Sequence, residues 1–64
     1  MTLENELDAY IDGLKAGADW FNTGIEKGIW TAPENPFPRG SNAAKEWERG
    51  CDHGFFDLED AYYS

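Results

Sequence analysis

Two eight-residue stretches, YIDGLKAG at residues 10–17 and WERGCDHG at residues 47–54, share an aromatic residue followed by two glycines four positions apart. The second stretch begins 37 residues after the first. Glycine inside a helix costs ~1 kcal/mol relative to alanine, so four glycines in two short helices need a compensating contact. Glycines four positions apart lie on one helix face and remove side-chain bulk there. The pattern favours close helix–helix packing over its alternative, a glycine-floored groove for a partner.

Apolar residues extend the first stretch into one amphipathic helix, predicted from about residue 3 to residue 22. Thr2 is the expected N-cap, and Glu4 and Glu6 follow where acids favour the helix dipole. The predicted apolar stripe consists of Leu3, Leu7, Tyr10, Leu14, Gly17 and Phe21, widened by Ile11, Ala18 and Ile25.

The second stretch lies in a second amphipathic helix, predicted from about residue 42 to residue 60 with Ser41 as its N-cap. Asp57, Glu59 and Asp60 oppose the dipole at its C-terminal end, which predicts fraying there. The apolar stripe of this helix consists of Ala44, Trp47, Cys51, Phe55, Leu58 and Tyr62.

The segment 23–40 is the predicted connector. Gly24 and Gly28 are the expected stop signals of the first helix. Three prolines forbid a helix further along and favour extended backbone before them: Pro33, Pro36 and Pro38. Large apolar side chains in the same segment indicate a loop that folds back over the helices and closes one end of the core: Ile29, Trp30 and Phe37.

Strands are not expected, because valine is absent and no stretch alternates apolar and polar residues. The sequence predicts a single all-α domain over residues 1–64, a two-helix hairpin with a proline- and aromatic-rich connector. Several large side chains fall outside the two apolar stripes and are the candidate partner-binding residues: Trp20, Trp30, Phe37, Phe56 and Tyr63. A lone hairpin would expose them, so we expect either a symmetric homodimer with a four-helix core or a monomer that uses them to bind a partner.

The net charge is −8, with 13 acidic residues against five basic ones. Affinity for nucleic acid comes largely from Lys and Arg on phosphates, so we expect no direct binding to free DNA or RNA. The acids form either a solvated surface or one that attracts basic proteins or imitates a phosphate backbone.

No catalytic, cofactor-binding or metal site is predicted. Cys51 lies on the apolar stripe and is expected to be a buried packing residue, whereas His53 diverges from it by the helical rotation and is expected at the surface. His53 and Asp57 could supply two metal ligands, which do not make a site. One cysteine, no membrane-length apolar run and no secretory signal favour a soluble protein of a reducing cytoplasm.

Over about residues 10–56, the order of these motifs resembles the ribosome modulation factor family of small bacterial proteins, whose relatives also occur in phages and plasmids. The residues that carry the resemblance are Tyr10, Gly13, Gly17, Asn35, Pro36, Phe37, Ser41, Trp47, Gly50 and Gly54. The resemblance implies two helices joined by a long connector and, for the namesake, binding to the ribosome in stationary phase. The namesake is strongly basic, whereas this chain is acidic.

The favoured function is therefore a small non-catalytic regulator, encoded by a phage or mobile element, that binds a host protein or nucleoprotein complex in the bacterial cytoplasm. Two alternatives stay open. One is a ribosome-associated modulation factor, and the other is an acidic nucleic-acid mimic that inhibits a DNA- or RNA-binding enzyme.

Overall fold

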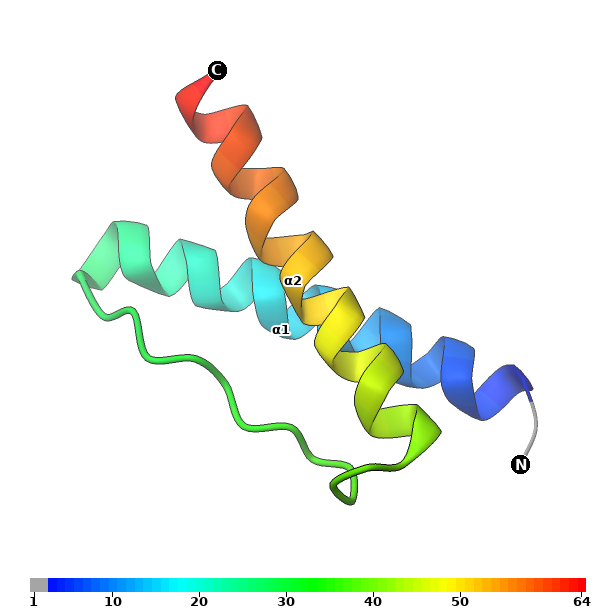
Figure 1. Ribbon diagram of the computed structural model, residues 1–64. Coiled ribbons are helices and arrows are strands. Elements are labelled where there is room, and N and C mark those ends of the chain that lie inside the picture. Colours follow the sequence, from blue (N-terminus) through cyan, green and yellow to red (C-terminus); the bar gives the residue numbers. More distant parts are fainter. Residues whose placement is uncertain (1–2) are drawn as a thin grey trace.

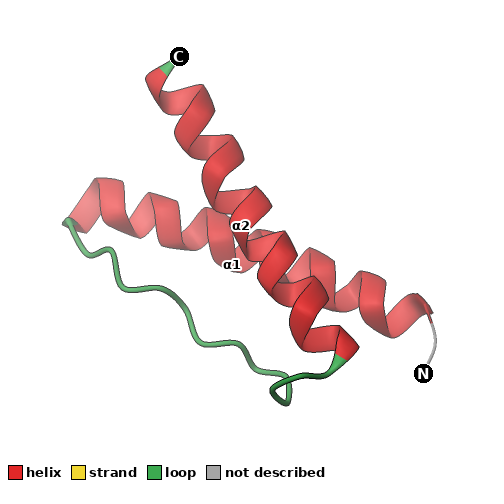
Figure 2. Cartoon of the chain, viewed as in Figure 1, coloured by secondary structure: helices red, strands yellow, loops and turns green. Residues whose placement is uncertain are grey.

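The computed structural model describes residues 3–64, with side chains from residue 6 onward, as two packed α-helices (Figure 1). Helix α1 spans Leu3–Lys27 and helix α2 spans Asn42–Tyr63. No strand occurs in this part of the chain (Figure 2). The predicted all-α fold, two helices packed against each other and joined by a long connector, is confirmed. The expected N-cap Thr2 and the side chain of Glu4 lie outside the described part.

Helix α1 ends five residues beyond its predicted end at residue 22. Gly28 has φ +72°, a left-handed conformation suited to glycine, and its N–H donates to the carbonyl of Gly24 at 2.9 Å. Gly28 is therefore the stop, and Gly24 lies inside the helix. The ring of Trp30 packs directly against Gly24, where a side chain would overlap it.

Helix α2 begins as predicted and ends three residues later than predicted. The Ser41 hydroxyl accepts from the Ala44 N–H at 3.1 Å and donates to the Pro38 carbonyl at 2.7 Å. The predicted fraying at the acidic end was wrong, because the helix stays regular to Tyr63. Tertiary packing stabilises the last turn: the ring centroid of Tyr62 lies 5.7 Å from that of Phe21 in α1.

The two helices run in the same direction and touch at their glycines. A Cβ placed on Gly13 would overlap the carbonyl oxygen of Trp47, and one on Gly17 would overlap that of Cys51. Later residues of α1 therefore meet later residues of α2. Backbone lies directly against backbone at this crossing, so the four glycines serve close helix packing and do not form an open groove.

The contacts repeat with the same 37-residue offset as the sequence. A Cβ on Gly13 would meet Trp47 and Cys51, and a Cβ on Gly50 would meet Tyr10 and Leu14, each 37 residues earlier. The two helices are thus related by a pseudo-two-fold axis that runs between them. The internal sequence repeat therefore corresponds to two helices that make equivalent contacts with each other.

The buried face of α1 differs from the predicted stripe. It consists of Ala9, Gly13, Gly17, Phe21 and Gly24, whereas Leu7 is 58% exposed and Ile11 and Ile25 are also exposed. Close backbone approach excludes long side chains from the contact, so small residues mark the buried face and larger ones flank it.

The buried face of α2 follows the prediction over most of its length. Ala44, Trp47, Cys51 and Phe55 are buried, together with Ala43 and the two glycines. Leu58 is only half-buried and Tyr62 is exposed. The predicted buried stripe of α2 is therefore confirmed from Ala44 to Phe55, whereas its last two residues are partly or fully exposed.

The connector, residues 28–41, runs back from the end of α1 to the start of α2 (Figure 1). Because the helices are parallel and offset by 37 residues, Asn42 at the start of α2 lies level with residue 5 of α1. The connector must therefore span the length of α1 from residue 5 to Lys27, about 33 Å at ~1.5 Å per residue. An extended, polyproline-like chain of this length reaches about 45 Å at ~3.1 Å per residue. Asn35 anchors it, because its Nδ2 donates to the Ala44 carbonyl at 2.9 Å and its Oδ1 accepts from the Phe37 N–H at 3.0 Å.

We expect deletion of residues 31–34 to disrupt the intramolecular pair. The shortened connector reaches only about 34 Å at ~3.1 Å per residue, which leaves nothing for the turns at both helix ends. Circular dichroism and sedimentation should show either lost helix or a dimer with exchanged helices. Replacement of the same four residues by Gly-Ser-Gly-Ser is the control and should keep the native mass and helicity. A deletion variant with unchanged mass and stability would contradict the parallel arrangement.

Candidate interaction surface

Seven of the ten aromatic residues gather at the C-terminal halves of the two helices. The buried rings of Phe21 and Phe55, with centroids 5.5 Å apart, form the centre of this aromatic cluster. Figure 1 shows that the two helices diverge beyond the glycine crossing. The ring of Phe21 in α1 contacts the rings of Phe55 and Tyr62 in α2 at this end of the pair. The cluster consists of Trp20, Phe21, Trp30, Phe55, Phe56, Tyr62 and Tyr63.

The outer members of the cluster are open to solvent. The exposed fractions are 46% for Trp30, 54% for Phe56, 59% for Tyr62 and 70% for Tyr63. Ile29, next to Trp30 in the sequence, and Ile25, near the end of α1, are also exposed. We call these six residues the exposed aromatic face. Such a concentration of exposed large apolar side chains is typical of interaction surfaces.

The structure separates the five predicted partner-binding residues. Trp30, Phe56 and Tyr63 lie in the exposed aromatic face. Trp20 is half-buried, with its ring centroid 4.2 Å from that of Phe55. Phe37 is half-buried elsewhere, against the core that Ala43 and Trp47 help to form.

Sequence reasoning assigned Tyr62 and Ile25 to the buried stripes and so missed them as surface residues. The last glycine of the repeat, Gly54, carries the signal that could have found them. Close helix contact stops at the last glycine, so apolar residues two turns beyond it face the opening between the helices.

Acidic residues lie beside the part of the exposed aromatic face that α2 supplies, whereas Lys27 lies beside the part from α1 and the connector. Residues 52–64 contain four acids and no Lys or Arg. Helical spacing places Asp52, Glu59 and Asp60 three or four residues from Phe56, beside it on the helix surface. The surface around Phe56 is therefore both apolar and negatively charged.

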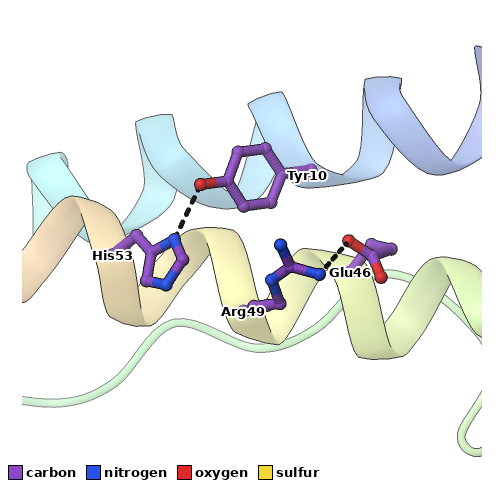
Figure 3. A network of polar contacts seen from close by, with 4 residues as sticks. All are labelled: Tyr10, Glu46, Arg49 and His53. Carbon is purple, nitrogen blue, oxygen red and sulfur yellow. Dashed lines mark hydrogen bonds and ion pairs between the residues drawn. The ribbon is translucent and has the colours of Figure 1, made fainter.

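Two pairs of polar contacts flank the glycine crossing. The Tyr10 hydroxyl shares a hydrogen bond with His53 Nδ1 at 2.7 Å, and the Arg49 guanidinium lies 5.6 Å from the Tyr10 ring centroid (Figure 3). At the pseudo-symmetric position, the Trp47 indole N–H donates to Asp12 Oδ2 at 3.0 Å. Arg49 also pairs with Glu46 at 3.4 Å. His53 is thus exposed, as predicted, yet it joins the two helices.

Cys51 is a buried free thiol, as the apolar stripe predicts. Burial, and then the charges of Asp52 and Glu48, raise the pKa of this thiol. A raised pKa keeps it protonated and unreactive at neutral pH. Because the thiol of the unfolded chain has its ordinary pKa of ~8.5, ionisation at high pH lowers the free energy of the unfolded chain more than that of the folded chain. Stability is therefore complete below that pH and falls as the pH rises toward the raised value.

We expect iodoacetamide to alkylate Cys51 in the native protein at pH 8 at least tenfold more slowly than in urea-unfolded protein. The physical reason is the combination of burial and low thiolate content. Mass spectrometry over a time course measures both rates. Equal rates would contradict the buried position of Cys51.

Within residues 3–64, no helix is long and apolar enough to cross a membrane, and no group of three His, Cys, Asp or Glu residues is placed to hold a metal ion. Comparisons with known protein families, curated proteins and solved structures find no match for this chain.

Proposed function

We propose that this chain is a small non-catalytic regulatory protein, of phage or mobile-element type, that binds a basic surface of a host protein or nucleoprotein complex. The observation that supports the proposal is the exposed aromatic face with the acidic residues beside its α2 part. Phe56, Tyr62 and Tyr63 supply large, rigid apolar area, which is typical of residues that dominate binding energy. The acids favour a basic partner and hasten encounter with it at low salt.

The test is capture of partners from a bacterial lysate with paired surface variants. We expect the wild-type chain to retain a defined basic protein, and Phe56→Ser with Tyr63→Ser to lose it. Leu7→Ser is the matched control, because Leu7 is equally exposed but lies at the other end of α1. Loss of the protein in the control as well, or retention in the double variant, would contradict the proposal.

The captured protein also distinguishes the two alternative functions. A set of ribosomal proteins that survives gradient sedimentation of the lysate would favour a ribosome-associated factor, the function implied by the family resemblance. A nucleic-acid enzyme that is released when salt is raised, and whose DNA or RNA competes with this chain, would favour an acidic mimic.

A second copy of this chain is the other candidate occupant of the exposed aromatic face. In a symmetric dimer the acidic residues of the two copies would face each other, which opposes association most strongly at low salt. Sedimentation equilibrium at micromolar concentration separates the two uses. A measured mass of 7.2 kDa would show a monomer, whose exposed aromatic face is free to bind a partner. A measured mass of twice that value, which returns to the monomer mass in Phe56→Ser, would show that a second copy covers the face.

We expect no binding to duplex DNA or free RNA at ~150 mM salt, where charges act over a Debye length of ~8 Å. The chain carries −8 overall, and three of its five basic residues lie next to an acid in the sequence. An electrophoretic mobility shift assay at micromolar protein measures this. A shifted band would contradict the expectation and favour direct contact with ribosomal RNA.

A further inference from the structure

The connector covers one face of α2 on one side of the helix pair. Asn35 Nδ2 donates to the Ala44 carbonyl at 2.9 Å, and the ring centroid of Trp30 lies 5.9 Å from that of Phe55. Between these two points, Pro33 lines a hollow together with residues of α2. We call the α2 residues along this path the covered α2 face: Ala44, Glu48, Cys51 and Phe55.

The pseudo-two-fold axis gives α1 an equivalent face on the opposite side of the pair. Side-chain contacts follow this symmetry, because Arg49 lies over the Tyr10 ring. The residues 37 positions from these two, Asp12 and Trp47, form the equivalent pair. The α1 residues that lie 37 positions before the covered α2 face are Leu7, Ile11, Leu14 and Ala18. We call them the open α1 face.

The open α1 face is exposed where its counterpart is buried. Leu7 is 58% exposed, whereas the equivalent Ala44 is 3% exposed. Ile11 is 40% exposed, and Leu14 and Ala18 are half-buried. Because the connector lies on the other side of the pair, this apolar surface remains in contact with water.

The connector also shows which kind of chain fits such a face. Its prolines hold the backbone extended and lack N–H donors, so the chain needs few hydrogen bonds from an apolar helix surface. A chain that is already extended loses less conformational entropy on binding. The large side chains of the connector, Trp30 and Phe37, supply contact area against the helices. Ile11 stands where α2 carries Glu48, so the open α1 face is apolar at all four positions and favours apolar side chains.

We propose that the open α1 face binds an extended, proline-containing segment of a partner protein, whose large apolar side chains cover Leu7 and Ile11. The segment runs antiparallel to α1, as the connector runs antiparallel to α2. Burial of the exposed apolar side chains stabilises the complex. The site is separate from the exposed aromatic face, which lies toward the other end of the pair, so it adds a second binding surface beyond the proposed function.

The test is a titration of the ¹⁵N-labelled full chain with the acetylated and amidated peptide GIWTAPENPFPRGS, the sequence of residues 28–41, followed by backbone amide NMR signals. The peptide carries one Glu and one Arg, so net charge does not attract it to the acidic chain. We expect saturable shifts centred on Leu7 and Ile11. The same peptide with Ser in place of Trp30 and Phe37 should bind at least about fivefold more weakly, because it loses most of its apolar area. No saturable shift, equal binding of the two peptides, or shifts centred on the covered α2 face, which would indicate displacement of the connector, would overturn the proposal.

Ile11→Ser should weaken binding of the peptide about fivefold or more, because the lost apolar contact is not replaced by a hydroxyl. Ile25→Ser is the matched control, because it removes the same side chain from the same helix at nearly the same exposed fraction, 38% against 40%. It should leave peptide binding within about twofold, as is usual for a surface substitution away from the site. Equal losses in the two variants would overturn the assigned face. Where Ile11→Ser melts below the wild type, Leu7→Ser repeats the measurement.

Ile25 belongs to the exposed aromatic face, so Ile25→Ser should weaken capture of the basic partner while the peptide titration stays unchanged. Failure of the proposed function and failure of this site are therefore distinguishable. Sedimentation equilibrium of the wild type and of Ile11→Ser tests a second copy as the occupant, and we expect the same mass for both. A dimer mass in the wild type that returns to the monomer mass in Ile11→Ser would show that a second copy covers the open α1 face and would overturn the proposal.

Discussion

Gly50→Ala is expected to lower the melting temperature of the protein by several degrees, about 4–8 °C for each kcal/mol of stability lost in a domain of this size. The added Cβ would overlap the carbonyl oxygen of Tyr10 and lie 3.0 Å from the backbone nitrogen of Leu14. Backbone cannot rotate away as a side chain can, so the two helices must separate. Overpacking of this kind costs ~1–3 kcal/mol, which outweighs the ~1 kcal/mol gained in helix propensity. A chain of this size has only ~3–5 kcal/mol in total.

Thermal melting followed by circular dichroism measures the effect. Asn22→Ala is the control, because Asn22 is exposed in α1 and the change raises helix propensity without entering the contact. Its melting temperature should be equal to or above that of the wild type. Gly13→Ala should match Gly50→Ala, because the two glycines occupy equivalent places across the pseudo-two-fold axis. A melting temperature for Gly50→Ala that is unchanged or raised would show that the glycines do not form the crossing.

Trp47→Ala is expected to remove nearly all of the stability. Trp47 is 4% exposed and packs with Ala9, Ala43 and Cys51, and its N–H is bonded to Asp12. Truncation of a buried large aromatic residue costs ~3–5 kcal/mol, which is comparable with the whole free energy of unfolding of so small a domain.

Urea denaturation separates the packing of this residue from its hydrogen bond. Trp47→Phe keeps most of the ring but loses the bond to Asp12, so we expect a loss of about 1 kcal/mol. Trp47→Ala should lose at least three times as much. Similar losses in the two variants would show that the hydrogen bond, rather than the buried ring, determines the contribution of Trp47.

The exposed aromatic face was only partly predictable. The sequence shows that Trp30, Phe56 and Tyr63 lie off the apolar stripes, and these three residues are exposed at the same end of the pair. The same reasoning placed Tyr62 in the core. Helical spacing shows which residues share a face, but it does not show how far along that face the neighbouring helix stays in contact. The hollow between the connector and the helices, lined among others by Trp20, Pro33 and Glu48, had no sequence signal, because its lining comes from three separate segments of the chain.

The sequence by itself determined the local structure. Helix-period spacing, the Ser41 N-cap and the glycine after Lys27 specify two helices, and three prolines specify an extended connector. The repeat of aromatic residues and glycines also specified that the helices touch at Gly13, Gly17, Gly50 and Gly54. These signals act through steric and hydrogen-bonding preferences of neighbouring residues, so they can be recognised without knowledge of the rest of the chain.

Only the tertiary structure decided the direction of the pair and the identity of its surface. Parallel pairing depends on the reach of the connector and on backbone contacts between residues 37 positions apart. Those contacts bury the small residues of α1 and leave Leu7 and Ile11 at the surface, the reverse of what side-chain hydrophobicity alone predicts. The physical reason is that, when two backbones touch, the contact selects for absence of side-chain volume, which hydrophobic periodicity does not measure.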